Sequence, residues 1–143
     1  MMADFIYDKA KPRLMGGISD GAIIPNTHSF KCALLKPTHT PGKATHEFFS
    51  DVSGDEIVGG GYTAGGKAMT AAFTRSGVTV KFDADDLVYS TLSPEFRYAV
   101  VYDDSHASKA LVGLLDFLTT QLPNASPVTI AFNAAGVFTM TDG

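Results

Sequence analysis

Residues 71–82 read AAFTRSGVTVKF and give the clearest secondary-structure signal in the chain. In the second half of this stretch, apolar residues alternate with polar ones, which is the period of a β-strand with one buried face. The connection Arg75-Ser76-Gly77 is short and ends in glycine, as in many hairpin turns. We therefore predict a β-hairpin whose strands are residues 71–74 and 78–82.

The same period of two recurs before and after this hairpin. It predicts further strands over residues 30–34, 87–92 and 96–102. An apolar run from Ala110 to Leu118, interrupted by Asp116, is interpreted as a buried central strand, with a helix as the alternative. The last two predicted strands, Val128–Phe132 and Val137–Thr141, would form a hairpin with each other.

The first half of the chain has weaker periodicity. Apolar residues four positions apart predict a short helix within residues 3–16, and residues 45–52 suggest a second one. The segment Gly54 to Gly66 contains six glycines, so we expect a flexible loop with little packing.

Short strands separated by frequent turn signals predict a mainly β fold. We expect a single-domain β-sandwich or open barrel spanning residues 1–143, with one or two short helices near its N-terminal half. Residues 1–28 would form an N-terminal arm, a short helix and loop, and residues 29–143 the β core.

The composition fits a folded domain rather than a disordered tail, because 45% of the 143 residues are hydrophobic and only 18% are charged. The net charge is −4, and the eleven Lys and Arg residues are scattered, which argues against a nucleic-acid partner. The chain shows no signal-peptide pattern and no apolar run of ~20 residues. We therefore expect a soluble protein made in the cytoplasm, with no membrane partner.

The single cysteine, Cys32, excludes an intrachain disulfide. It lies between Phe30 and Leu34 on the apolar face of a predicted strand. This position indicates a small buried hydrophobe rather than a reactive thiol.

One segment nearly matches a phosphate-binding loop, since Gly61 to Ala68 follows G-x-x-x-x-G-K with alanine in place of Ser or Thr. Such a loop needs a following helix and a hydroxyl that binds magnesium. Alanine cannot bind the metal, and the residues after Lys67 indicate strands. Residues 59–64 also fit a relaxed dinucleotide motif, and the same missing helix counts against it. We interpret the segment as a glycine-rich surface loop.

Acidic residues cluster at three turns, and their spacing does not follow a calcium-binding loop. Capping of turns explains these acidic residues at least as well, and calcium held by converging turns is the alternative. The three clusters are Asp51, Asp55 and Glu56; Asp83, Asp85 and Asp86; and Asp103 and Asp104. The four histidines lack the spacing of a zinc site and are interpreted as loop or surface residues. Ser105-His106 lies next to Asp103, but sequence neighbours rarely form a hydrolase triad. We predict no catalytic residue, no metal and no cofactor.

Several segments, taken in order along most of the chain, resemble small virion structural proteins encoded by tailed bacteriophages and prophages. These segments are Phe5–Ala10, Ala33–Leu35, Glu47–Val52, Tyr62–Gly66, Phe82–Asp86, Arg97–Asp103 and Ile130–Phe138. The resemblance carries no functional residues over to this chain.

What the resemblance implies is a non-enzymatic virion component, foremost a capsid decoration or cement protein that binds and stabilises the assembled head shell. Its partners would be the major capsid protein and further copies of itself, as in a homotrimer. A head–tail connector or tail component, and a receptor- or glycan-binding module, are the alternatives. The candidate contact residues are Tyr62, an aromatic in the glycine-rich segment, and Phe5 and Ile6 in the N-terminal arm.

Overall fold

The computed structural model describes residues 4–14, 23, 27–76, 79–132 and 138–141. Within them lie ten β-strands, one α-helix and two short 3₁₀ helices. The elements in chain order are β1 (Phe5–Ile6), α1 (Ala10–Leu14), β2 (Phe30–Leu35), η1 (Phe49–Asp51), η2 (Ser53–Asp55), β3 (Lys67–Met69), β4 (Ala71–Ser76), β5 (Thr79–Ala84), β6 (Leu87–Leu92), β7 (Phe96–Asp103), β8 (Leu111–Gln121), β9 (Ser126–Ile130) and β10 (Phe138–Thr141).

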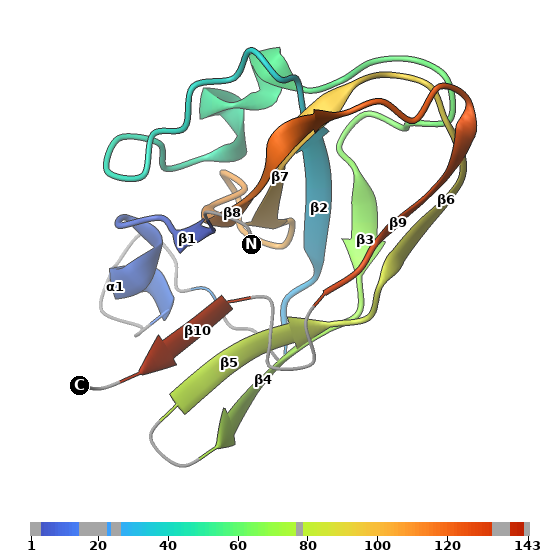
Figure 1. Cartoon of the computed structure of the whole chain (residues 1–143). Coiled ribbons are helices and arrows are strands. Elements are labelled where there is room, and N and C mark those ends of the chain that lie inside the picture. Colours follow the sequence, from blue (N-terminus) through green and yellow to red (C-terminus); the bar gives the residue numbers. More distant parts are fainter. Residues whose placement is uncertain (1–3, 15–22, 24–26, 77–78, 133–137, 142–143) are drawn as a thin grey trace.

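The strands form three antiparallel groups (Figure 1). The largest sheet has the order β1-β8-β7-β2-β3, with Ala33 of β2 opposite Val100 of β7 and Val100 opposite Leu114 of β8. A three-stranded sheet has the order β10-β5-β4, and β6 pairs with β9 in a two-stranded ribbon. The mainly β fold with a short helix near the N-terminus is therefore confirmed.

The large sheet is buried on both faces. Successive residues of β7 from Tyr98 to Asp103 are all buried, although they point alternately to opposite sides. On one face, the ring of Tyr102 stacks on Phe49 with 4.3 Å between ring centroids. On the other face, Phe30 meets Phe82 of β5 edge to face at 5.1 Å, which joins the two larger sheets. Continuous apolar runs in β2, β7 and β8 follow from this double coverage.

Most of the predicted strands are confirmed. The hairpin of residues 71–82 is present as β4 and β5, with Phe73 opposite Phe82. Residues 87–92 form β6, and the apolar run after Ala110 forms β8, so the alternative of a helix there is wrong. β8 lies between β1 and β7, however, and the central strand of the sheet is β7. Cys32 is fully buried, and burial raises the pKa of its thiol to about 12, as expected for an inert core residue.

The predicted C-terminal hairpin is wrong. β9 pairs with β6, through Val88 opposite Thr129, and β10 pairs with β5, through Phe138 opposite Phe82. The residues expected to form its turn, 133–136, lie outside the described residues. Alternation indicates that a segment is extended, but it carries no information on which neighbouring edge the segment joins.

The two predicted helices are shorter than expected. Residues 5 and 6 form an edge strand instead, extended by a hydrogen bond from the Tyr7 N–H to the carbonyl of Val112 (3.0 Å), and among residues 4–14 the helix covers Ala10–Leu14. Within residues 45–52, the helical character is limited to a single 3₁₀ turn, Phe49–Asp51. In the part of the chain that the structure describes, no helix is long and apolar enough to cross a membrane.

The Asp51 carboxylate stabilises this turn, because its Oδ2 accepts hydrogen bonds from the backbone N–H groups of Glu47 and Phe48, both at 2.9 Å. The bonds from Phe48 and then Glu47 lower the pKa of Asp51 below its ordinary value of 3.8. Because the pKa of Asp51 is lower in the folded state, its carboxylate stabilises the fold at pH values above the unfolded-state pKa. That contribution is lost as the pH falls through the folded-state pKa.

We expect Asp51→Asn to lower the free energy of unfolding by about 0.5–1 kcal/mol at pH 7, because a neutral amide is a weaker acceptor. The difference from the wild type should persist down to about pH 4.5 and shrink toward pH 2. Urea unfolding at several pH values measures it. The control is Asp85→Asn, since Asp85 is exposed and its carboxylate makes no hydrogen bond within the described residues. A difference that stays constant down to pH 2 would contradict the prediction.

Candidate functional site

The glycine-rich segment is packed against the sheet, contrary to the expectation of a loop with little packing. Gly61 and Gly66 both have a φ of +85°. A Cβ atom at Gly61 would lie 1.6 Å from the carbonyl oxygen of Thr91, and one at Gly66 would lie 2.0 Å from that of Cys32. The glycines therefore allow this segment to approach β6 and β2 at backbone contact distance, which a side chain would prevent.

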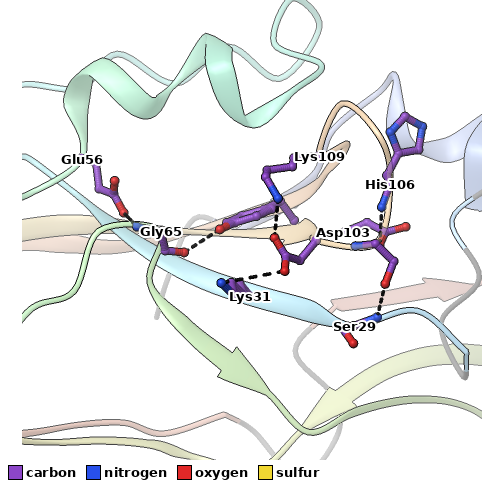
Figure 2. A network of polar contacts seen from close by, with 10 residues as sticks. Ser29, Lys31, Glu56, Gly65, Asp103, His106 and Lys109 are labelled. Carbon is purple, nitrogen blue, oxygen red and sulfur yellow. Dashed lines mark hydrogen bonds and ion pairs between the residues drawn. The ribbon is translucent and has the colours of Figure 1, made fainter.

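A polar network holds the same segment in place (Figure 2). The Tyr62 hydroxyl donates a hydrogen bond to the Glu56 carboxylate and accepts one from the Leu34 N–H (3.1 Å). Glu56 also accepts the N–H of Gly65 (2.7 Å), and the Gly65 carbonyl accepts the hydroxyl of Tyr102 (2.6 Å). Burial, together with the hydrogen bond to Glu56, raises the pKa of Tyr62, so its hydroxyl remains a donor.

The geometry of this segment differs from that of a phosphate-binding loop. Lys67 begins β3, so a strand follows the glycines where the motif requires a helix, as predicted. The Lys67 ammonium lies 4.8 Å from the ring centroid of Tyr89, in a cation–π contact. The lysine that resembles the phosphate-binding residue thus packs on a core tyrosine.

A second part of the network closes the turn after β7. Asp103 is fully buried, and its Oδ2 lies 2.5 Å from Nδ1 of His28. Its Oδ1 accepts the N–H groups of Ser105 (2.9 Å) and His106 (3.2 Å). The Ser29 N–H donates to the Ser105 hydroxyl (2.8 Å), which ties the same turn to the start of β2 (Figure 2).

These contacts assign other roles to the side chains that resembled a hydrolase triad. Asp103 pairs with His28, while Nδ1 of His106 accepts the N–H of Ser108 (3.0 Å). Ser105 accepts a backbone N–H from the neighbouring strand end. Each side chain therefore stabilises the turn, and the arrangement lacks the Ser-to-His contact that a triad needs.

The prediction that aspartates cap turns is confirmed for three of them, since side-chain oxygens of Asp51, Asp83 and Asp103 accept backbone N–H groups within four positions. Asp86 has a different role, because its carboxylate accepts the N–H of Phe132, 46 positions away. Asp104 binds the ammonium of Lys109 (2.6 Å) and lies 3.8 Å from that of Lys31. Among the described residues, no three His, Cys, Asp or Glu side chains are arranged to hold a metal ion.

His39 and His106 lie in loops, as one of the two interpretations of the histidines expected, but they are not surface residues. They are only 4% and 7% exposed. Nδ1 of His39 lies 2.7 Å from the Asp55 carboxylate, and its ring centroid lies 5.7 Å from that of His46. Sequence reasoning missed this pair because the residues are seven positions apart in a segment with no clear period.

Three buried polar atoms near this pair have no hydrogen-bond partner within the described residues: Nε2 of His39, Nδ1 of His46 and the hydroxyl of Tyr7. The Tyr7 and His46 ring centroids are 6.5 Å apart, so the three side chains form a continuous row. Burial, and then the charge of Asp51, raise the pKa of Tyr7, which keeps it a neutral donor.

The predicted contact residues lie in two separate places. Phe5 and Ile6 form β1 at one edge of the large sheet, and both are half-buried. Tyr62 is half-buried against β2, near the opposite edge, and its hydroxyl is engaged in the network. The structure therefore does not bring the three together. For the alternative of a glycan-binding module, exposed tyrosines are expected as contacts, but Tyr89 and Tyr102 are only 2% and 1% exposed.

The N-terminal segment is anchored to the rest of the chain through Arg13 of α1. This side chain is 1% exposed, and its Nη1 lies 2.8 Å from Oε1 of Glu47. Its guanidinium also lies 5.1 Å from the ring centroid of Phe48. α1 and β1 are thus held in a defined position, with the outer edge of β1 facing away from β8.

Comparison of this chain with protein-family models, with curated proteins and with solved structures gives no match.

Proposed function

We propose that this chain is a non-enzymatic structural protein of a tailed-bacteriophage particle, and specifically a decoration protein that binds the assembled head shell. The proposal rests on the resemblance of its segments to virion proteins, and on one feature of the fold that suits adhesion to a partner. That feature is β1, an edge strand with two half-buried apolar side chains, Phe5 and Ile6.

An edge strand offers a partner both backbone and side-chain contacts. Among the described residues, β1 pairs with β8 alone, and its other edge is the one that a strand of a neighbouring subunit would join. Anchoring of α1 through Arg13 and Glu47 keeps this edge in position before binding, which reduces the entropy lost on association. Repetition of a modest contact over a symmetric shell then gives a large total stabilisation.

The stoichiometry of purified particles tests this proposal. Mass spectrometry with labelled standards measures the chain against the major capsid protein. We expect about one copy per capsid subunit, or about one per three, since decoration follows the symmetry of the shell. A ratio of about one per thirty or lower would replace decoration with a head–tail connector or tail role, and absence from particles would refute the virion proposal.

A substitution tests the role of β1. We expect the double variant Phe5→Ala, Ile6→Ala to bind particles that lack the protein at least about tenfold more weakly than the wild type, because two anchors are truncated. The control is Val88→Ala, which removes an exposed side chain on β6. Circular dichroism checks that both variants fold. A folded double variant that binds like the wild type would rule out β1 as the contact.

A further inference from the structure

A shallow apolar depression lies at the end of the large sheet where β2 ends and β7 begins. It has a volume of about 490 Å³, and its lining combines apolar side chains with one residue of each charge: Lys36, Pro37, Thr38, Ile57, Val58, Pro94 and Glu95. None of these residues belongs to the polar network or to β1.

Backbone hydrogen bonds bring three distant segments together here. The Lys36 N–H donates to the carbonyl of Asp55 (2.8 Å), which places residues 55–58 beside the end of β2. The Ser93 N–H donates to the carbonyl of Gly60 (2.9 Å), which places the turn before β7 beside the same segment. On the other side of that turn, Phe96 is opposite Gln121, the last residue of β8, and Leu122 follows it.

Val58, which lines the depression, is the most exposed large apolar side chain of the described residues, and Leu122, which follows the end of β8, is the second. Val58 is 82% exposed and Leu122 is 70% exposed. Val58 stands out from the floor formed by Ile57, which is buried. Exposed apolar side chains that gather around a concave surface are typical of protein interaction sites.

The charges on the rim indicate which partner fits. Lys36 and Glu95 are both exposed, and neither forms an ion pair with another described residue. A surface with one free positive and one free negative group around an apolar centre is complementary to itself when rotated by a twofold axis. Each lysine then meets the other copy's glutamate, while the apolar centres pack together.

We propose that a second copy of this chain docks on this depression, in a twofold-symmetric dimer. Val58 of each copy packs into the depression of the other. Lys36 of one copy pairs with the partner's Glu95, and the reverse pair forms on the other side of the axis. This inference does not depend on the proposed virion role, because it concerns the isolated protein.

Sedimentation equilibrium of the purified full-length chain tests the dimer. We expect concentration-dependent dimerisation of the wild type, and a dimer dissociation constant at least about tenfold higher for Val58→Asp, which places a charge in the apolar centre. The matched control is Val88→Asp, since Val88 is also an exposed valine and lies on β6, away from the depression. A wild type that stays monomeric up to about 1 mM, or equal weakening by both aspartates, would overturn the proposal.

A charge exchange tests the pairing itself. Lys36→Glu and Glu95→Lys should each weaken self-association, because each variant places like charges opposite one another. A mixture of the two variants should restore it, because the mixed dimer has two complementary pairs. A role of these residues within one chain predicts no restoration, and that result would refute the twofold arrangement. Failure of the dimer would leave particle binding through β1 unaffected, so the two proposals fail separately.

Discussion

Gly66→Ala is expected to lower the free energy of unfolding by more than about 3 kcal/mol, one of the largest effects of any single substitution in this chain. The added Cβ would lie 2.0 Å from the carbonyl oxygen of Cys32 and 2.6 Å from its carbon, both of which are backbone atoms of a buried strand. The positive φ of +85° adds about 1–2 kcal/mol for any residue with a Cβ. The glycine segment would have to move off β2, and its hydrogen bonds to Glu56 and Tyr102 would be strained.

Substitutions at two other glycines separate the clash of the added Cβ from the conformational cost of a positive φ. At Gly59 the φ is +111° and no atom lies within 4 Å of the added Cβ, so alanine there carries only the conformational cost of about 1–2 kcal/mol. At Gly54 there is neither a contact nor a positive φ, so alanine should be neutral or slightly stabilising. Urea unfolding of the three variants should give the order Gly54→Ala, Gly59→Ala, Gly66→Ala from most to least stable. Equal stabilities for Gly59→Ala and Gly66→Ala would show that the close approach to β2 is absent in solution.

Asp103→Ala is expected to lower the free energy of unfolding by about 3 kcal/mol, because it removes a fully buried carboxylate that three groups depend on. The backbone N–H groups of Ser105 and His106 would lose their acceptor, and His28 would lose the carboxylate 2.5 Å from its Nδ1. Hydrogen exchange of the amides at positions 105 and 106 should accelerate more than exchange in the middle of β7.

The matched control is the neighbouring Asp104→Ala. Its side chain is 27% exposed, and it pairs with Lys109 and Lys31, whose ammonium groups water can solvate. Loss of such a partly exposed pair should cost less than about 1 kcal/mol. Similar losses for Asp103→Ala and Asp104→Ala in thermal or urea unfolding would contradict the view that Asp103 organises the turn.

Local patterns predicted the strands but not the pairing of the last two. Strand positions follow from alternation, which is a property of a few neighbouring side chains, as in residues 78–82 and 96–102. Burial of Cys32 was predictable for the same reason, since its neighbours at two-residue spacing are apolar. β10 pairs with β5, which lies more than fifty residues earlier in the chain, rather than with the nearer β9. Alternation within β10 carries no information on which of these two strands it joins.

The polar contacts were beyond reach from the sequence, because each joins residues that are distant along the chain. Nothing near Asp103 indicates that His28 lies against it, 75 positions away. The glycine-rich segment reads as a flexible loop, since composition shows that a backbone can bend but not that Gly61 and Gly66 meet the backbone of other strands. Tyr62 likewise reads as a free aromatic, whereas Glu56 and the Leu34 N–H occupy its hydroxyl.

By itself the sequence determined a mainly β chain, its principal strands, an inert buried cysteine and turns capped by aspartates, because these properties depend on residues within a few positions of one another. Only the tertiary structure decided which strands share a sheet, which histidines are buried and where the exposed apolar side chains gather. Val58 and Leu122 are 64 positions apart in the sequence. They lie at one end of the sheet because β2, β7 and β8 pair side by side, and no local preference specifies that pairing.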